Sequence, residues 1–300
     1  MANGQVTVMK RLIVILFCMI LPGFTACIRD DLSNCPVPVN ACLTFSYTGD
    51  TGDPAMFRKR IDHVTLMVFD DAGNRVVDRT IEKSELLKFQ GTELYLEPGN
   101  YRAVCWGNAD EHTRIADGES FERGRLHHPH FMETKEIATN SHLYYGTYDF
   151  SVPEHGMAEG DIPFRGAHIN VEIYVRSSMA GTNGYGIKVH NLMPQYDQRM
   201  NAAQPFATTY YPQMSYNTER ILDQCLFQSL RFADDNPVVV EILRPSGETM
   251  TVDLKEYMAR QGLRVDGKNE ATVPILFEFS DLGVVIKVPE WLAHIVTPGT

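Results

Sequence analysis

One stretch of the chain gathers residues that could bind a transition metal. Imidazole and carboxylate groups at short spacing are ligands for zinc and copper. Pro129 interrupts the helix that would place such ligands on one face, and no further ligand follows at a defined spacing. The pattern favours a solvated loop over a metal site, and no cofactor is expected. The candidate ligands are His112, His127, His128, His130 and Glu133.

Other groups of reactive residues also favour a structural interpretation. Asp70, Asp71 and Asn74 resemble the start of a calcium loop, but the acid that completes the twelve-residue pattern is missing, so a hairpin turn is expected. The basic run Arg58 to Arg60 could be a protease site, although a solvated loop is the simpler interpretation. Several tyrosines could line a sugar-binding surface, but strand tyrosines more often belong to the core. These are Tyr144, Tyr145, Tyr148, Tyr210 and Tyr211.

No local motif supplies a catalytic centre. The sequence has no Gly-x-Ser-x-Gly elbow, His-Glu-x-x-His helix, phosphate-binding glycine loop or dinucleotide fingerprint. Serine, histidine and aspartate occur, yet no spacing singles out a nucleophile with its base. We therefore predict no catalytic residue and no enzymatic activity.

The N-terminus has the layout of a bacterial export signal ending at a cysteine. Lys10 and Arg11 precede an apolar run, Leu12 to Leu21, which is too short to span a bilayer comfortably. Thr25 and Ala26 then stand directly before Cys27, an arrangement that resembles a lipobox. We predict a signal peptide over residues 1–26 and lipid attachment at Cys27. The alternative is an ordinary secretory signal that leaves Cys27 free.

Charge restricts how the mature chain could reach a membrane. Loss of residues 1–26 removes Lys10 and Arg11 and no acid, so the formal net charge falls from −11 to −13. Such an acidic chain is not expected to bind nucleic acid or to adhere electrostatically to anionic lipid. The acyl chains on Cys27 must then supply the attachment. Residues 27–38 are expected to form a polar spacer after the lipid.

The remaining cysteines predict no metal or redox centre. They are widely spaced and contain no Cys-x-x-Cys pair. Two of them could form a disulfide, Cys35 with Cys42, but Cys42 stands in a strand pattern where cysteine behaves as a small apolar residue. The cysteines after Cys27 are Cys35, Cys42, Cys105 and Cys225.

From Ala41 onward apolar residues recur with a period of two, which predicts β-strands. The clearest alternation begins after Asp161, where Ile169, Val171 and their successors alternate with polar residues. Short strands separated by turns need a second sheet to cover their apolar faces. We predict an all-β chain with two tandem antiparallel β-sandwich domains, 39–160 and 161–300. Helices are minor, with candidates at Ile81 to Lys88, Glu219 to Leu230 and Leu254 to Arg260.

The segment from Leu96 to Asn108 should form a strand buried on both faces. Pro98 presets a turn and Gly99 permits unusual backbone angles before the strand begins. Tyr101, Ala103 and Cys105 then occupy one face, while Val104 and Trp106 occupy the other. Such a strand belongs in a sandwich interior or against a neighbouring domain.

Four segments together resemble the FimB-type family of fimbrial anchor lipoproteins of Bacteroidetes. They are Cys27 to Leu32 with Cys35-Pro36, Val64 to Asn74, Leu96 to Asn108 and Val288 to Trp291. The resemblance implies two transthyretin-like sandwiches and a role in fixing a fimbria to the outer membrane, with a limit on its length. It implies fimbrial stalk or accessory subunits as partners. Arg29, Asp30 and Asp31 resemble the acidic signal that directs such lipoproteins to the cell surface.

Two other functions remain open from the sequence. The chain could be a surface glycan-binding lipoprotein of a polysaccharide-uptake system, which would need an exposed aromatic platform. It could also be a lipidated hydrolase that uses the histidine group.

Overall fold

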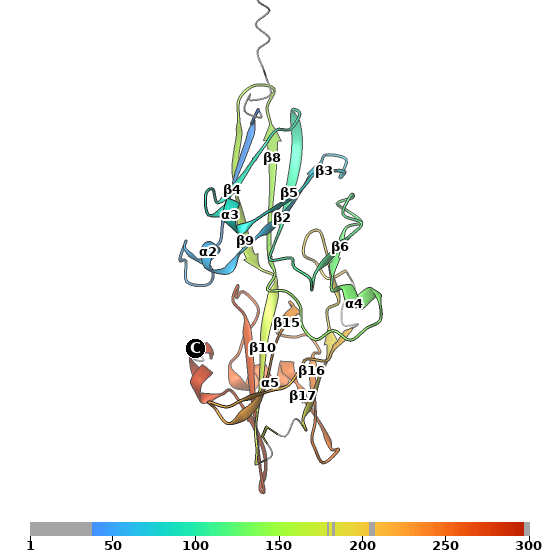
Figure 1. Cartoon of the computed structure of the whole chain (residues 1–300), viewed down its shortest axis with the longest axis vertical. Coiled ribbons are helices and arrows are strands. Elements are labelled where there is room, and N and C mark those ends of the chain that lie inside the picture. The colour runs from blue at the N-terminus through green and yellow to red at the C-terminus, as the bar shows by residue number, and fades with distance from the viewer. Residues whose placement is uncertain (1–37, 179, 182–183, 204–207, 297–300) are drawn as a thin grey trace, which may run out of the picture. The chain divides into compact units, whose positions relative to one another are not determined.

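Alternating apolar residues fold most of the chain into four β-sheets in the computed structural model (Figure 1). The structure describes residues 38–178, 180–181, 184–203 and 208–296. All described strands and helices lie within one compact unit that begins at Val39. Cys27, Arg29, Asp30, Asp31 and Cys35 lie outside the described residues.

The first half of the chain forms a seven-stranded sheet. Two of its strands, β1 and β9, run parallel over six residue pairs, and the other neighbouring strands are antiparallel. In sheet order the strands are β3 (Arg75–Ile81), β2 (Val64–Asp70), β5 (Gly99–Gly107), β8 (Tyr144–Val152), β9 (Ala158–Gly166), β1 (Ala41–Ser46) and β4 (Gly91–Leu94).

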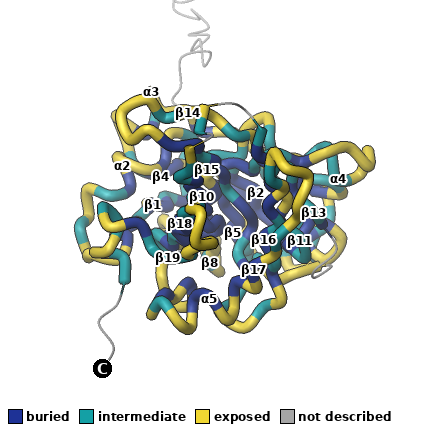
Figure 2. The backbone as a smooth tube through the Cα atoms, turned by 90° about the horizontal axis from the view of Figure 1, so that it is seen from below, coloured by how far each residue is buried: buried dark blue, intermediate teal, exposed yellow. Residues whose placement is uncertain are grey.

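This sheet curls into a nearly closed barrel around one core. All seven strands contribute apolar side chains to a single cluster, which includes Leu43, Val68 and Ile162. Phe57 of helix α2 (Met56–Arg60) and Leu86 of helix α3 (Lys83–Leu86) are buried in the same cluster. Figure 2 shows the buried positions running through the sheets and the exposed positions concentrated in connections. The apolar stripe of each strand is thus covered by the sheet's own curvature.

The second half forms a two-sheet sandwich. The five-stranded sheet has the order β14 (Ser215–Asn217), β15 (Leu222–Leu230), β10 (His168–Arg176), β18 (Thr272–Ser280) and β19 (Gly283–Lys287). The four-stranded sheet has the order β13 (Thr208–Tyr210), β11 (Gly186–Leu192), β16 (Val239–Leu243) and β17 (Thr249–Asp253).

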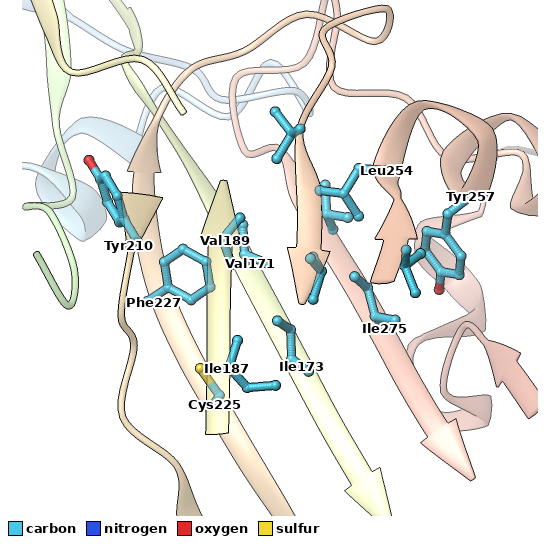
Figure 3. Packing of buried hydrophobic residues seen from close by; sticks show 14 of the residues in the cluster. Val171, Ile173, Ile187, Val189, Tyr210, Cys225, Phe227, Leu254, Tyr257 and Ile275 are labelled. Carbon is cyan, nitrogen blue, oxygen red and sulfur yellow. The ribbon is translucent and has the colours of Figure 1, made fainter. Parts of the chain in front are cut away.

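The core of the sandwich lies between these two sheets. Val171 and Ile173 of β10 face Ile187 and Val189 of β11, and Phe227 of β15 completes the packing (Figure 3). Helix α5 (Leu254–Gln261) buries apolar side chains in the same cluster. The helix is capped at its start by the Asp253 carboxylate and ends at Gly262 in the left-handed conformation.

A third layer covers the outer face of the seven-stranded sheet. Its three-stranded sheet has the order β12 (Gln195–Asp197), β7 (Arg125–His127) and β6 (Arg114–Ala116), with the short helix α4 (Pro129–Met132) following β7. Val104 and Trp106 of β5 are fully buried beneath this layer, and Tyr196 of β12 stacks on Trp106 with 5.9 Å between ring centroids. The prediction of a strand buried on both faces is confirmed.

Several sequence expectations are corrected. The sheets are mixed rather than purely antiparallel, because β1 pairs with β9 and β10 with β18 in parallel. The helix expected at Glu219 to Leu230 is wrong, since Leu222–Leu230 is a strand that pairs with β10 over eight residues. Pairing with a long neighbour and burial of alternate residues outweigh local helix propensity there. The predicted helices at 81–88 and 254–260 are confirmed as α3 and α5.

The change of sheet falls between β9 and β10, which are separated by Ala167 alone. The division into domains 39–160 and 161–300 remains our proposal, with β9 spanning its boundary. A final 3₁₀ helix, Glu290–Ile295, places Trp291 against Tyr174. In the part of the chain that the structure describes, no helix is long and apolar enough to cross a membrane.

Candidate functional site

The histidine group folds as a hydrogen-bonded turn around α4. His127 Nδ1 lies 2.8 Å from the carbonyl oxygen of His128, and the His130 amide donates to His128 Nδ1 at 3.0 Å. His130 Nδ1 lies 2.7 Å from the backbone oxygen of Glu136. Burial, followed by the charges of His130 and His112, lowers the pKa of His128 to about 4. Among the described residues, no group of three or more histidine, cysteine or acidic side chains is arranged to hold a metal ion.

The other candidate residues from the sequence are structural. Asp70 begins a hairpin turn in which its carboxylate accepts the Asn74 amide at 2.8 Å and Gly73 has φ 78°. The predicted turn is confirmed. The Arg58 to Arg60 run forms the last turn of helix α2, not a loop, and its side chains are exposed.

Of the five tyrosines considered in the sequence, three are buried, whereas Tyr148 and Tyr211 are half-buried. Tyr144, Tyr145 and Tyr210 are at most 3% exposed, and each hydroxyl has a hydrogen-bond partner within the chain. The prediction that strand tyrosines serve the core is confirmed for these three. Within the described residues, Cys42, Cys105 and Cys225 form no disulfide.

A cleft over the outer face of the seven-stranded sheet brings together charged and aromatic side chains and is a candidate binding site. It opens where the third layer ends, beside the buried ring of Phe121, and continues past the turn between β2 and β3. Its two adjoining parts each measure about 490 Å³. The outer face of β5 forms the floor of the cleft. Alternate residues of a strand point to the same side, so Arg102 lies on the same face as the buried Val104 and Trp106.

Two ion pairs enclose Phe121 in this cleft. Arg102 binds Asp149, its cross-strand partner on β8, with contacts of 2.5 and 2.8 Å. Arg199 binds Glu122 with contacts of 3.0 and 2.5 Å. The guanidinium carbons lie 4.8 and 4.3 Å from the centre of the Phe121 ring. Such bidentate pairs stacked on an aromatic ring fix the orientation of both arginines.

Arginine partners keep the two acids of the cleft ionised. The hydrogen bond from Arg199 lowers the pKa of Glu122, and that from Arg102 lowers the pKa of Asp149. Both acids therefore stay ionised and act as fixed acceptors. Arg165 lies over Tyr145 at 5.3 Å and has no ion pair with any described residue. The cleft offers charged groups of both signs, with the Asn100 amide and the Ser151 hydroxyl at its rim.

Sequence reasoning missed a second polar cluster, which connects the two halves of the described chain. Glu270 accepts hydrogen bonds from the hydroxyls of Tyr47 and Tyr144, and its carboxylate lies 3.2 Å from Arg60 Nε. The Asp50 carboxylate accepts the backbone amide of Glu270 at 3.0 Å. Burial and the Glu270 hydrogen bond raise the pKa of Tyr47. The cluster positions the connection before β18 against the loop after β1.

Comparison with known structures finds the same fold in several bacterial proteins. A candidate polysaccharide-binding protein from Bacteroides thetaiotaomicron is 14% identical, with a TM-score of 0.68 over 83% of this chain and 96% of that one. A candidate adhesin from the same organism is 18% identical, with a TM-score of 0.66 over 86% and 98% of the two chains. The fimbrial anchor protein Mfa2 from Porphyromonas gingivalis is 18% identical, with a TM-score of 0.59 over 83% and 95%.

The fold is thus one shared with fimbrial anchors and with proteins described as adhesins. A family model, the fimbrillin-A associated anchor proteins Mfa1 and Mfa2, matches residues 32–297. The chain belongs to this family of fimbrial anchor proteins, and the resemblance found in the sequence is confirmed. A search of curated protein sequences gives no significant match.

Proposed function

We propose that this protein is a non-enzymatic surface lipoprotein that fixes a fimbria to the outer membrane through acyl chains on Cys27. The observation that carries the proposal is the family match, which begins at residue 32, five positions after Cys27, and extends to residue 297. The fold accounts for nearly the whole length of the related anchor. Attachment then separates into two parts, a lipidated N-terminus and a folded body that binds fimbrial subunits.

The sequence around Cys27 supports this division. A single acyl chain binds a membrane weakly, whereas the several chains of a bacterial lipoprotein make attachment effectively permanent. Acidic residues beside the lipid cannot add attraction to anionic headgroups. Arg29, Asp30 and Asp31 are instead proposed to direct the protein to the outer leaflet. The partners proposed for the folded body are fimbrial stalk or accessory subunits.

The tether is tested by fractionation of cells that carry Cys27→Ala. We expect the variant to leave the membrane fraction and fimbriae to be shed into the medium. Cys42→Ala is the matched control, because this half-exposed thiol lies on β1 within the fold and is not proposed to carry lipid. A Cys27→Ala protein that stays in the membrane with fimbriae attached would exclude the proposed tether.

Gene deletion tests the anchoring role and the limit on length together. Without the anchor, we expect fimbriae to be detached and longer than in the parent strain, as seen by electron microscopy of cells and medium. Fimbriae that remain attached at normal length would refute the proposal. Surface exposure is tested separately by adding protease to intact cells that carry Asp30→Asn with Asp31→Asn. We expect the variant to be protected from cleavage while the parent protein is degraded.

A second candidate function is binding of a surface glycan, and the cleft beside Phe121 favours it. One structural relative is described as a candidate polysaccharide-binding protein. The cleft offers fixed carboxylates, guanidinium groups and an amide, which can hydrogen-bond to sugar hydroxyls. Of the tyrosines considered for a sugar-binding platform, the half-buried Tyr148 lines the cleft, whereas Tyr144, Tyr145 and Tyr210 are buried. Affinity for a panel of polysaccharides that is lost in Arg102→Ala would favour this function. Absence of binding across the panel would leave anchoring alone.

A further inference from the structure

The two parts of the cleft beside Phe121 differ in charge. The part over β8 and β9 is lined by one acid, Asp149, and by three arginines, which makes it the basic end of the cleft. The arginines are Arg102, Arg165 and Arg199. The part beside the turn between β2 and β3 is lined by one arginine and four acids, which makes it the acidic end. The four acids are Asp70, Asp71, Glu122 and Asp149.

Arg165 has no acidic partner among the described residues. Arg102 and Arg199 each bind a carboxylate, whereas Arg165 is held by its cross-strand neighbour on β8, Tyr145. Its guanidinium carbon lies 5.3 Å from the centre of the Tyr145 ring, and the side chain is exposed. A ring below a guanidinium group fixes the cation without using its N–H donors. The basic end therefore has a positioned positive charge that is available to a ligand.

A short side chain separates the two cations on the floor of the basic end. β5, β8 and β9 are neighbours in the sheet (Figure 1), and Arg165 of β9 lies opposite Tyr145. Arg102 of β5 lies opposite Asp149, four residues and about 13 Å further along β8. Thr147 stands midway on the same face, and its hydroxyl donates to a backbone oxygen of β5 at 2.9 Å. The space above this threonine is thus bounded by an arginine at each end.

Both arginines act electrostatically on the same ring. Burial raises the pKa of Tyr145, while the charges of Arg165 and Arg102 act in the opposite direction. An anion placed between the two guanidinium groups would be attracted by both. A carboxylate matches them best, because its two oxygens can accept a pair of parallel N–H bonds from an arginine.

The acidic end suits hydroxyl groups rather than further anions. Glu122 and Asp149 stay ionised because arginines donate to them. At the rim, the Asn100 amide donates to Asp71 at 3.1 Å and accepts the Ser151 hydroxyl at 2.6 Å. The carboxylates keep acceptor positions for hydroxyl donors, but they would repel a second anion. A peptide rich in aspartate or glutamate is therefore a poorer ligand than a molecule with one anionic group and several hydroxyls.

We propose that this cleft binds an acidic sugar, with its carboxylate at Arg165 in the basic end and sugar hydroxyls at the carboxylates of the acidic end. Arg165 then determines specificity for an acidic over a neutral saccharide. Each part of the cleft measures about 490 Å³, which is within the range of small-molecule sites. The inference rests on the second candidate function, binding of a surface glycan, and specifies the class of glycan.

The requirement for a carboxylate is tested by calorimetry on the whole purified protein. The probes are short oligosaccharides of galacturonic acid, of mannuronic acid and of hyaluronan, and each control is the same oligosaccharide with its carboxylates converted to methyl esters. We expect at least one acid to bind with a Kd below about 1 mM and its ester to bind at least about tenfold more weakly. Added salt should weaken the acid and not the ester.

Three outcomes would overturn the proposal. They are failure of all three acids to bind, equal binding of each acid and its ester, and tighter binding of a triglutamate peptide than of any acidic sugar. Equal binding of acid and ester would leave the glycan-binding function standing and remove only its acidic specificity. Anchoring is measured independently on fimbriae, so its failure is distinguishable from failure of this inference.

The role of Arg165 is tested with Arg165→Gln. We expect this exposed substitution to weaken the acidic probe about tenfold and to leave binding of the ester unchanged. Arg165→Lys, which keeps the charge but loses the planar fork, should recover part of the affinity. Arg260→Gln is the matched control, since Arg260 is also exposed and has no ion pair with a described residue, but lies in the last turn of α5. Equal effects of the two glutamine substitutions on the acidic probe would refute the assignment of Arg165.

Discussion

The buried histidine at the start of β10 should make the fold sensitive to mild acid. His168 is 2% exposed, and its Nδ1 lies 2.9 Å from the carbonyl oxygen of Leu143. The neighbouring ring of His142 lies 5.1 Å away, centroid to centroid. Burial lowers the pKa of His168 from the usual 6.5 to about 4, more than the Leu143 hydrogen bond can offset.

The size and sign of the effect follow from proton linkage. Between pH 6.5 and about pH 4 the unfolded chain binds a proton at His168 that the folded chain does not. The free energy of unfolding must therefore fall as the pH is lowered through this window. The slope is about 1.4 kcal/mol per pH unit, and the full loss is about 3 kcal/mol. Above pH 6.5 the histidine contributes no pH dependence.

Urea unfolding between about pH 7 and pH 4.5 measures this loss. The parent protein is compared with His168→Gln, which removes the titrating group, and with His155→Gln, a matched substitution at an exposed turn. Carboxylates and the buried His128 contribute equally to all three proteins, so the difference between curves isolates His168. We expect the His168→Gln curve to be flatter and the His155→Gln curve to follow the parent. Three parallel curves would refute the assignment of a lowered pKa to burial of His168.

Two further predictions concern packing and thiol chemistry. Gly166→Ala should destabilise the fold by about 1–3 kcal/mol, because the new Cβ would lie 2.0 Å from the backbone oxygen of Asn269. Gly186→Ala, whose Cβ would meet no atom closer than 3.6 Å, should change the melting temperature little, and equal losses would contradict the steric argument. Burial raises the pKa of Cys225 to about 12 and that of Cys105 further, so iodoacetamide should label both thiols at least about 100-fold faster after unfolding. Rapid labelling of either thiol in the native protein would show that its burial is not maintained.

The sequence predicted those strands and turns that are determined by the residues within them. The alternation at β10 and the Pro98-Gly99 turn before β5 are visible in the sequence because each strand buries its own apolar face. The parallel pairing of β1 with β9 is not visible, since strands more than a hundred residues apart carry no local sign of their register. The error at β15 has a similar cause: its long pairing with β10 is a tertiary interaction.

The candidate sites were hidden for the same physical reason. Arg102, Arg165 and Arg199 lie far apart in the sequence and meet only because different elements bring them to one cleft.

The parallel pairing of β1 with β9 has a mechanical consequence for a protein anchored at one end. A pull from the N-terminal side enters the fold at Ala41, whereas β9 continues into β10 from its opposite end, after Gly166. The two strands are then pulled in opposite directions along their lengths. Their ladder of six residue pairs is loaded in shear, so its hydrogen bonds must yield together instead of opening one after another as in a zipper. A strand in that position can carry tension that would peel apart a hairpin of the same length.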